Sequence, residues 1–193
     1  MLTEGKIIII TAPSGSGKTT LVRRLLADLP WLSFSVSACT RPPRSSEVHG
    51  KDYYFLPEQE FQKRIEENAF AEWEMVYPGK YYGTLKSELS RIWEEGKIPL
   101  VDIDVQGALE IQNTYPDTSL TIFIQAPSLE ALRERLLRRG TETPHSLEER
   151  VSKAGLELSF APQFDKIIIN DELETALQEL EDEVKSFVGE MVS

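Results

Sequence analysis

A run of four isoleucines that leads straight into a glycine-containing turn is the feature that most constrains the fold of this chain. Residues 6–11 are β-branched and almost uniformly apolar, which is typical of a strand buried on both faces of a parallel sheet. Residues 12–17 break this strand, and residues 18–29 place leucine and valine at helical spacing until Pro30 marks the stop. A strand, a turn and a helix in this order predict the first unit of an α/β fold.

The turn matches the phosphate-loop pattern G-x-x-x-x-G-K-[ST] except at its first position, where Ala12 stands in place of glycine. Such a loop turns its backbone N–H groups inward around an anion, and Gly15 and Gly17 supply the backbone freedom that this needs. The N-terminus of the following helix adds its positive dipole. An ordinary strand–helix turn is the alternative, but the flanking strand and helix favour a site for the phosphates of a nucleoside triphosphate over residues 12–20.

Two side chains of this loop have expected chemical roles. Lys18 is predicted to bridge the β- and γ-phosphates, and the Thr19 hydroxyl is predicted to ligate Mg²⁺. The other residues expected to surround the triphosphate are Ala12, Pro13, Ser14, Gly15, Ser16, Gly17 and Thr20.

Three more apolar segments, residues 98–104, 120–124 and 166–170, have the composition of buried strands and are separated by helical patterns. Residues 173–188 carry a long apolar stripe, and Asp171 is expected to cap that last helix. Alternating parallel-type strands and helices predict a three-layer α/β core.

Asp102 lies in the second apolar segment. A strand that ends in Asp beside a phosphate loop places a carboxylate near the metal, usually through water, although many such residues are only turn or cap residues. Asp104, two residues further on, is expected to point the same way and to lie nearer the substrate.

Residues 34–86 are dominated by Ser, Arg, Pro, Tyr and Gly, which indicates an inserted lobe rather than a continuation of the core. Two consecutive prolines separate Arg41 from Arg44, and a guanidinium fork held in this way suits a phosphate dianion, although a solvated basic turn is the alternative. The phenols, hydroxyls and the carboxylate of Glu72 in the same lobe suit a nucleoside monophosphate. Phe55 and Trp73 are expected to pack in the core of the lobe.

Composition excludes several classes of protein. The 193 residues carry 32 acidic and 21 basic side chains, a net charge of −11, which argues against extended binding to nucleic acid but leaves anionic small molecules possible. A single cysteine, Cys39, excludes an intrachain disulfide, and two distant histidines give little support to a His-rich metal site. With no signal-peptide pattern and no apolar run long enough to span a bilayer, a cytoplasmic protein without membrane partners, monomeric or homodimeric, is expected.

Several motifs together resemble guanylate kinases, and they occur in the order of that family over nearly the whole chain. They are Ser14 to Thr19, Ser37 with Thr40-Arg41 and Arg44, Gly50-Lys51-Asp52-Tyr53, Glu72-Trp73, Tyr82-Gly83-Thr84, Asp102-Ile103-Asp104 with Gln106-Gly107, and Arg139 to Glu142. The resemblance implies transfer of the γ-phosphoryl group of ATP, with Mg²⁺, to GMP and dGMP. It also implies a P-loop kinase core (residues 1–33, 87–127 and 163–193), a GMP-binding lobe (34–86) and a helical lid (128–162).

The resemblance also assigns roles to residues of the lobe and the lid. Those that would hold the GMP phosphate are Arg41, Arg44, Tyr53 and Tyr82. Those that would read guanine are Ser37, Glu72, Thr84 and Asp104, with Gly83 beside them. The lid arginines that would close over the phosphates, acting with Lys18 and Arg41 in catalysis, are Arg135, Arg139 and Arg150. Asn170 would lie beside adenine. The family often has serine at the position of Thr84, which retains the hydroxyl.

Alternatives remain at this stage. The helix dipole alone can explain basic residues at the C-terminal end of a helix. Arg133 and Arg138 are expected to be solvated. Guanylate-kinase-like domains also serve as protein-interaction modules, which typically have degraded phosphate loops, whereas Gly17, Lys18 and Thr19 are retained here. A kinase for AMP, a pyrimidine monophosphate or a phosphorylated ribose is a further alternative, and Glu72 with Asp104 argues for guanine.

Overall fold

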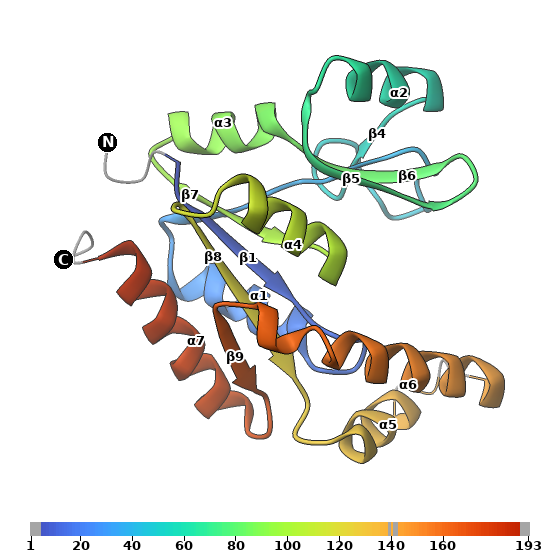
Figure 1. Cartoon of the computed structure of the whole chain (residues 1–193), viewed down its shortest axis with the longest axis vertical. Coiled ribbons are helices and arrows are strands. Elements are labelled where there is room, and N and C mark those ends of the chain that lie inside the picture. The colour runs from blue at the N-terminus through green and yellow to red at the C-terminus, as the bar shows by residue number, and fades with distance from the viewer. Residues whose placement is uncertain (1–4, 139, 141–142, 190–193) are drawn as a thin grey trace.

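The core of the protein is a parallel β-sheet with helices on both faces (Figure 1). A computed structural model describes residues 5–138, 140 and 143–189. Within them, a five-stranded sheet has the order β2-β7-β1-β8-β9, and every neighbouring pair is parallel. Its strands are β1 (Ile7–Thr11), β2 (Leu32–Phe34), β7 (Ile98–Asp102), β8 (Ser119–Gln125) and β9 (Lys166–Ile169). The three-layer α/β core predicted from the sequence is confirmed.

The four isoleucines of β1 belong to both halves of the core, and all four are fully buried. Ile8 and Ile10 pack with α1 (Lys18–Asp28) and α7 (Leu173–Val188), while Ile7 and Ile9 pack with α3 (Lys86–Glu94) and α4 (Val105–Thr114). Side chains alternate along a strand, so a run of isoleucine supplies apolar contacts to both faces at once. Each fully buried isoleucine contributes about 1.5–3 kcal/mol relative to exposure, which makes β1 the centre of the fold.

A second, smaller sheet forms the lobe, which lies beyond one end of the core (Figure 1). Its order is β4-β3-β6-β5. The elements are β3 (Ala38–Cys39), β4 (Tyr54–Phe55), α2 (Glu58–Glu66), β5 (Phe70–Tyr77) and β6 (Lys80–Leu85). The buried residues that join α2 to the sheet are Ala38, Leu56, Phe61, Phe70 and Leu85.

Two further helices, α5 (Leu129–Arg138) and α6 (Pro144–Leu158), pack against each other beside the ends of β1 and β8 (Figure 1). Leu132 and Leu136 of α5 contact Leu147 and Ala154 of α6 in a separate apolar cluster. The helix α6 begins with a reciprocal cap: the Ser146 backbone N–H donates to the Thr143 hydroxyl at 3.1 Å, and the Thr143 N–H donates to the Ser146 hydroxyl at 2.9 Å. These helices therefore have a small apolar core of their own.

Three sequence expectations differ from the structure. The cap of α7 is Glu172, with no side-chain cap hydrogen bond, so the prediction that Asp171 caps this helix is wrong. Trp73 is 39% exposed on β5 and lies outside the apolar cluster of the lobe. The strand β7 ends at Asp102, whereas Asp104 lies outside it as the N-cap of α4. No helix in the described part of the chain is both long and apolar enough to cross a bilayer.

Candidate active site

The phosphate loop joins β1 to α1 and is fixed by its backbone conformation. Gly15 and Gly17 have φ angles of 95° and 88°, in the left-handed region that favours glycine. A methyl group at Gly17 would also collide with the side-chain amide of Asn170. That amide is 5% exposed and donates to the Ser16 carbonyl at 2.7 Å. The methyl of Ala12 packs against the apolar core, which explains why glycine is not required there.

Asn170 therefore supports the loop from the end of β9. Its predicted place beside adenine stays a prediction, since the contact that the structure shows is with the loop itself. Thr19 and Thr20 lie in the first turn of α1, and both are exposed to solvent.

Lys18 and Asp102 form an ion pair between the first residue of α1 and the last residue of β7. The Lys18 ammonium also donates to the Ile103 carbonyl at 3.4 Å. Asp102 is the register partner of Ile10 in the neighbouring β1, so parallel pairing brings this carboxylate beside the loop. The structure thus brings together the two residues from which the sequence predicted phosphate binding and metal binding.

A cavity of about 440 Å³ lies between the phosphate loop and the lobe. Predicted site residues on its wall are Lys18, Ser37, Tyr53, Glu72, Tyr82, Gly83, Asp102 and Asp104. Wall residues to which the sequence assigned no role in the site are Phe34, Asp52, Glu74, Val76 and Ile103. The donor loop and the predicted acceptor groups therefore open into one space.

Glu72 is a buried carboxylate at the inner end of this cavity, with 5% of its surface exposed. The Thr84 hydroxyl, which is fully buried, donates to it at 2.6 Å. Burial raises the pKa of Glu72 to about 7, against the opposing effect of the Thr84 hydrogen bond. A Cβ at Gly107 would lie 2.9 Å from the Glu72 carboxylate, so glycine is needed there for the close approach of α4 to β5.

Asp104 lines the same cavity, but it does so as the cap of α4 rather than as a strand residue. Its Oδ1 accepts the Gly107 backbone N–H at 2.9 Å, which fixes the carboxylate at the helix N-terminus. Its neighbour Glu74 has a pKa raised to about 7, first by a hydrogen bond with Asp104 and then by partial burial. Strand alternation could have found Glu74, because it lies two residues beyond Glu72 on the same face of β5.

Arg41 lies behind the cavity wall, with its guanidinium over the Tyr53 ring at 4.8 Å from the ring centre. Glu47 accepts two hydrogen bonds from it, at 2.6 and 2.7 Å, and a third from the Arg44 backbone N–H at 2.8 Å. These hydrogen bonds, that of Arg41 first, lower the pKa of Glu47 to about 2. The sequence analysis missed Glu47, whose only signal is an acid three residues after Arg44. The side chain of Arg44 is exposed.

Of the three predicted lid arginines, one contacts the phosphate loop and one contacts the segment that follows β9. Arg150 of α6 donates to the Ser14 hydroxyl at 3.1 Å, and Arg135 of α5 donates to the Asp171 carbonyl at 3.3 Å. Arg139 lies outside the described residues.

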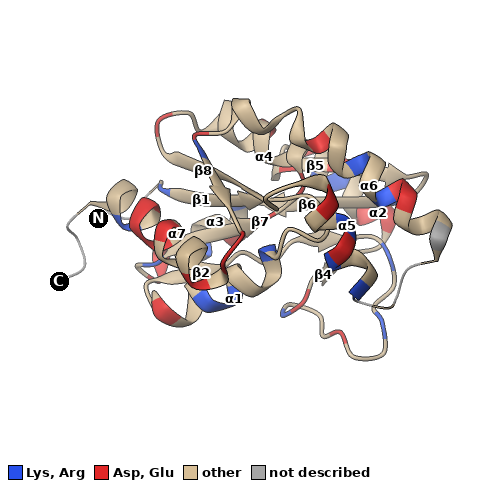
Figure 2. Ribbon diagram, turned by 90° about the horizontal axis from the view of Figure 1, so that it is seen from below, with Lys and Arg blue, Asp and Glu red and all other residues tan. Residues whose placement is uncertain are grey.

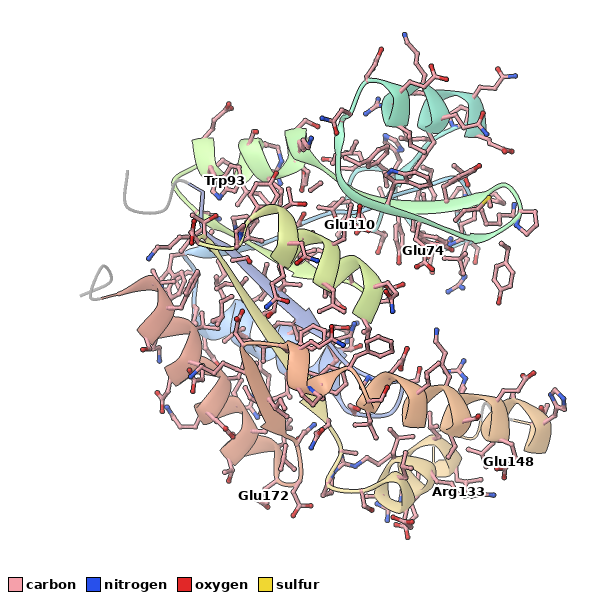
Figure 3. The ribbon with its side chains drawn as sticks, viewed as in Figure 1. Glu74, Trp93, Glu110, Arg133, Glu148 and Glu172 are labelled. Carbon is pink, nitrogen blue, oxygen red and sulfur yellow. The ribbon has the colours of Figure 1, made fainter. Side chains whose placement is uncertain are left out.

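The other two arginines of α5 are in surface ion pairs. Arg133 pairs with Glu148 across the two helices, as Figure 3 shows, and Arg138 pairs with Glu134. Figure 2 shows that α6 carries both acidic and basic residues, whereas α7 is marked mainly by acidic ones.

A phosphate loop on one side of a cavity and a lobe with phenols and carboxylates on the other define a P-loop kinase that phosphorylates a small molecule. The family model described as guanylate kinase matches residues 4–187, and the chain belongs to that family.

Individual relatives agree with this assignment over most of their length. Guanylate kinase from Bacteroides fragilis is 48% identical over 186 residues, covering 96% of this chain and 91% of that protein. Guanylate kinase from Porphyromonas gingivalis is 48% identical over 185 residues, covering 95% of this chain and 98% of that protein.

Solved structures support the same fold. The crystal structure of guanylate kinase from Anaplasma phagocytophilum superimposes with a TM-score of 0.74 at 28% identity, covering 97% of this chain and 88% of that chain. Shikimate kinase from Bacteroides thetaiotaomicron has a TM-score of 0.52 at 16% identity, which shows a shared fold alone.

Proposed function

We infer that the chain transfers the γ-phosphoryl group of ATP to GMP, and in the same way to dGMP, giving ADP and the nucleoside diphosphate. The main support for GMP as the acceptor is the carboxylate of Glu72. It is buried in the cavity, accepts a hydrogen bond from Thr84 and is flanked by Asp104. A buried carboxylate needs N–H donors from whatever occupies the space before it. Guanine offers N1–H and a 2-amino group in that role.

The same contacts reject other bases. Adenine has neither of these donors, so AMP would leave the carboxylate facing an unpaired nitrogen in a water-poor site. Sites built on hydrogen-bond recognition discriminate by on the order of 10⁴ or more. Pairing with two N–H groups also favours the ionised form of Glu72, because it opposes the effect of burial on the pKa. A phosphorylated sugar has no guanine donors at all.

Acceptor binding would place the phosphate of GMP beside Arg41, Arg44, Tyr53 and Tyr82. The transfer is an in-line attack by an oxygen of this phosphate, with no phosphoenzyme. That oxygen is already anionic, so no strong general base is required, and the work of the protein is positioning and charge stabilisation. Lys18, Arg135, Arg139 and Arg150 would neutralise the charge on the transferred group, and closure of residues 128–162 would exclude water.

Mg²⁺ is expected to enter with ATP. The Thr19 hydroxyl and the Asp102 carboxylate, the latter through water, are hard oxygen donors on adjacent elements and fit that ion. When bound, Mg²⁺ supplies neutralisation of charge on the β- and γ-phosphates. Lys18 would then leave its ion pair with Asp102 and turn to the phosphates, so that this pair holds the lysine in place until nucleotide binds.

The protein-interaction module is not favoured. The loop retains Gly17, Lys18 and Thr19, and the carboxylates of Glu72 and Asp104 line the cavity that opens from it. The division into core, lobe (34–86) and lid (128–162) supports separate donor and acceptor sites and stays part of the proposal. A cytoplasmic location, a monomeric or homodimeric state and the absence of nucleic-acid partners remain predictions from the sequence.

A coupled assay of ADP release with GMP, dGMP, AMP, CMP and UMP tests the function. We expect turnover with GMP and dGMP, and rates lower by several orders of magnitude with the others. A strong preference for AMP, or ADP release that no monophosphate stimulates, would contradict the proposal.

A further inference from the structure

Glu74 lies on the wall of the acceptor cavity, opposite Tyr82 of β6 in the strand register. Figure 3 shows it below the β5–β6 hairpin, on the side that faces α6. Since Tyr82 is predicted to hold the acceptor phosphate, a carboxylate at this position stands near a second negative charge. Two like charges at short range are unfavourable unless a cation lies close to them.

The cations nearest to this place already have carboxylate partners. Lys18 is paired with Asp102, and Arg41 is paired with Glu47. With substrates bound, Lys18 is expected to turn to the phosphates of ATP, and Arg41 is expected to hold both Glu47 and the acceptor phosphate, so both cations are already engaged. A cation for Glu74 has to come from another element.

Lys153 belongs to α6, the helix that lies on the side toward which Glu74 points (Figure 3). Its positive charge lowers the pKa of Glu74, although the larger effects of Asp104 and of burial raise it. Arg150, three residues earlier on α6, reaches Ser14 of the phosphate loop. Glu157, four residues later, interacts with the charges of Asp104 and Lys18. Residues at these spacings share one face of a helix, so this face of α6 is turned toward the phosphate loop and the charged residues of the cavity wall.

The present partner of Lys153 is easily exchanged. Its ammonium lies 3.6 Å from a Glu157 carboxylate oxygen, in a pair four residues apart on one helix, and the Lys153 side chain is 73% exposed. Exposed helix pairs of this kind contribute little, so the lysine can change partner at small cost.

We propose that Glu74 of the lobe and Lys153 of the lid form an ion pair across the acceptor cavity when both close over bound substrates. The pair acts as a positioning contact: it joins the two moving parts and neutralises Glu74 beside the acceptor phosphate. This inference rests on the proposed function, because it places a monophosphate in that cavity and a triphosphate at the loop.

A charge exchange tests the pair. The single variants Glu74→Lys and Lys153→Glu are expected to lower kcat/KM for GMP by roughly three- to tenfold, because each replaces an attraction by a repulsion of similar size. The double variant, which restores opposite charges in the reverse order, is expected to return to within about twofold of the parent protein. Rescue of this kind is not expected if the two residues act separately.

Thermal unfolding gives a second readout. In the substrate-free protein, the midpoints report only local effects, such as loss of the Lys153–Glu157 pair or of the Glu74–Asp104 hydrogen bond, so each variant is compared with its own substrate-free midpoint. With GMP, Mg²⁺ and a non-hydrolysable ATP analogue, the increase in Tm should be smaller in the single variants and should recover in the double variant.

Lys63→Glu is the matched control. Lys63 also pairs with a glutamate four residues later, at 3.7 Å, and its side chain is 72% exposed, but it lies on α2. This variant should leave kcat/KM unchanged. The proposal is overturned if the double variant is no better than the worse single variant, if the single variants match the parent, or if Lys63→Glu has the same effect. Failure of the proposed function would instead show in the parent protein, as ADP release that GMP does not stimulate.

Discussion

Glu47 accepts hydrogen bonds from the guanidinium of Arg41, and with the same carboxylate it holds the backbone of Arg44. One acidic side chain thus ties together the two arginines that are predicted to bind the acceptor phosphate. Glu47 and the Pro42 carbonyl take three of the five N–H groups that a guanidinium offers. The remaining two can serve a phosphate while Glu47 stays bound, so the site is shaped before the acceptor arrives.

Replacing Glu47 with Gln should therefore weaken GMP binding without touching the donor site. We expect KM for GMP to rise about tenfold or more, as for loss of a charge-assisted hydrogen bond, with KM for ATP unchanged. Calorimetry should show that affinity for guanosine, which lacks the phosphate, is unaffected. Glu60→Gln is the control, because Glu60 pairs with Arg64 on α2, outside the cavity wall. Equal losses for GMP and guanosine would show that Glu47 only maintains the lobe.

Replacing Lys18 with Ala should abolish turnover while the fold persists. Lys18 is predicted to contact the transferred group, and removal of one such charge-stabilising donor costs at least about 10²-fold in kcat. Its present partner, Asp102, keeps 21% of its side chain exposed and can be solvated when the lysine is lost. Steady-state kinetics measures the loss of turnover, and the thermal midpoint shows whether the fold persists. Turnover close to that of the parent would reject the assignment of the phosphate loop.

The buried strands were predictable because burial on both faces demands runs of β-branched residues, as in Ile7 to Ile10. The strand β2 (Leu32–Phe34) was not predictable. It is only three residues long, and its residues change from buried to exposed along its length, so it has no apolar run. The Asp171 prediction failed because residue type alone does not determine where a helix begins, and the chain enters α7 one residue later.

The site was predictable where its chemistry lies in one short segment, as in the phosphate loop. Glu47 could not be predicted in the same way, because its role depends on a turn that returns the chain to Arg41. Glu74 could have been found from the alternation that follows Glu72, but this requires knowing that the strand continues beyond Trp73. The proposed role of Lys153 could not be predicted from the sequence, because the position of its helix depends on the packing of α6 on α5.

Replacing Asn170 with Ala should loosen the phosphate loop even in the absence of nucleotide. The Ser16 carbonyl would lose a buried hydrogen bond, which costs about 1–3 kcal/mol of unfolding free energy. We expect a lower Tm in the nucleotide-free protein together with a higher KM for ATP. Asn113→Ala, at an exposed position of α4, serves as the control. If Tm is unchanged and only KM for ATP rises, Asn170 acts through adenine alone.

Replacing Glu72 with Gln should make the GMP-free protein more stable at high pH while it removes activity toward GMP. In the folded state the pKa of Glu72 is raised from 4.5 to about 7, so between these values the native state binds more protons than the unfolded state. The stability of the parent protein therefore falls as pH rises from about 4.5 to 7, and a neutral amide avoids this loss. The size of the effect follows from the shift and is about 1–3 kcal/mol.

This difference in unfolding free energy is measured by urea unfolding of the parent and of Glu72→Gln, without GMP, at pH 5 and at pH 8. Glu72→Gln should exceed the parent in unfolding free energy at pH 8 and lie close to it at pH 5, whereas its kcat/KM for GMP should fall by 10² or more because an amide cannot accept both guanine donors. A loss of stability at pH 8 would mean that Glu72 is held as a structural anion. The carboxylate would then not be an unfavourable buried charge that only the substrate satisfies.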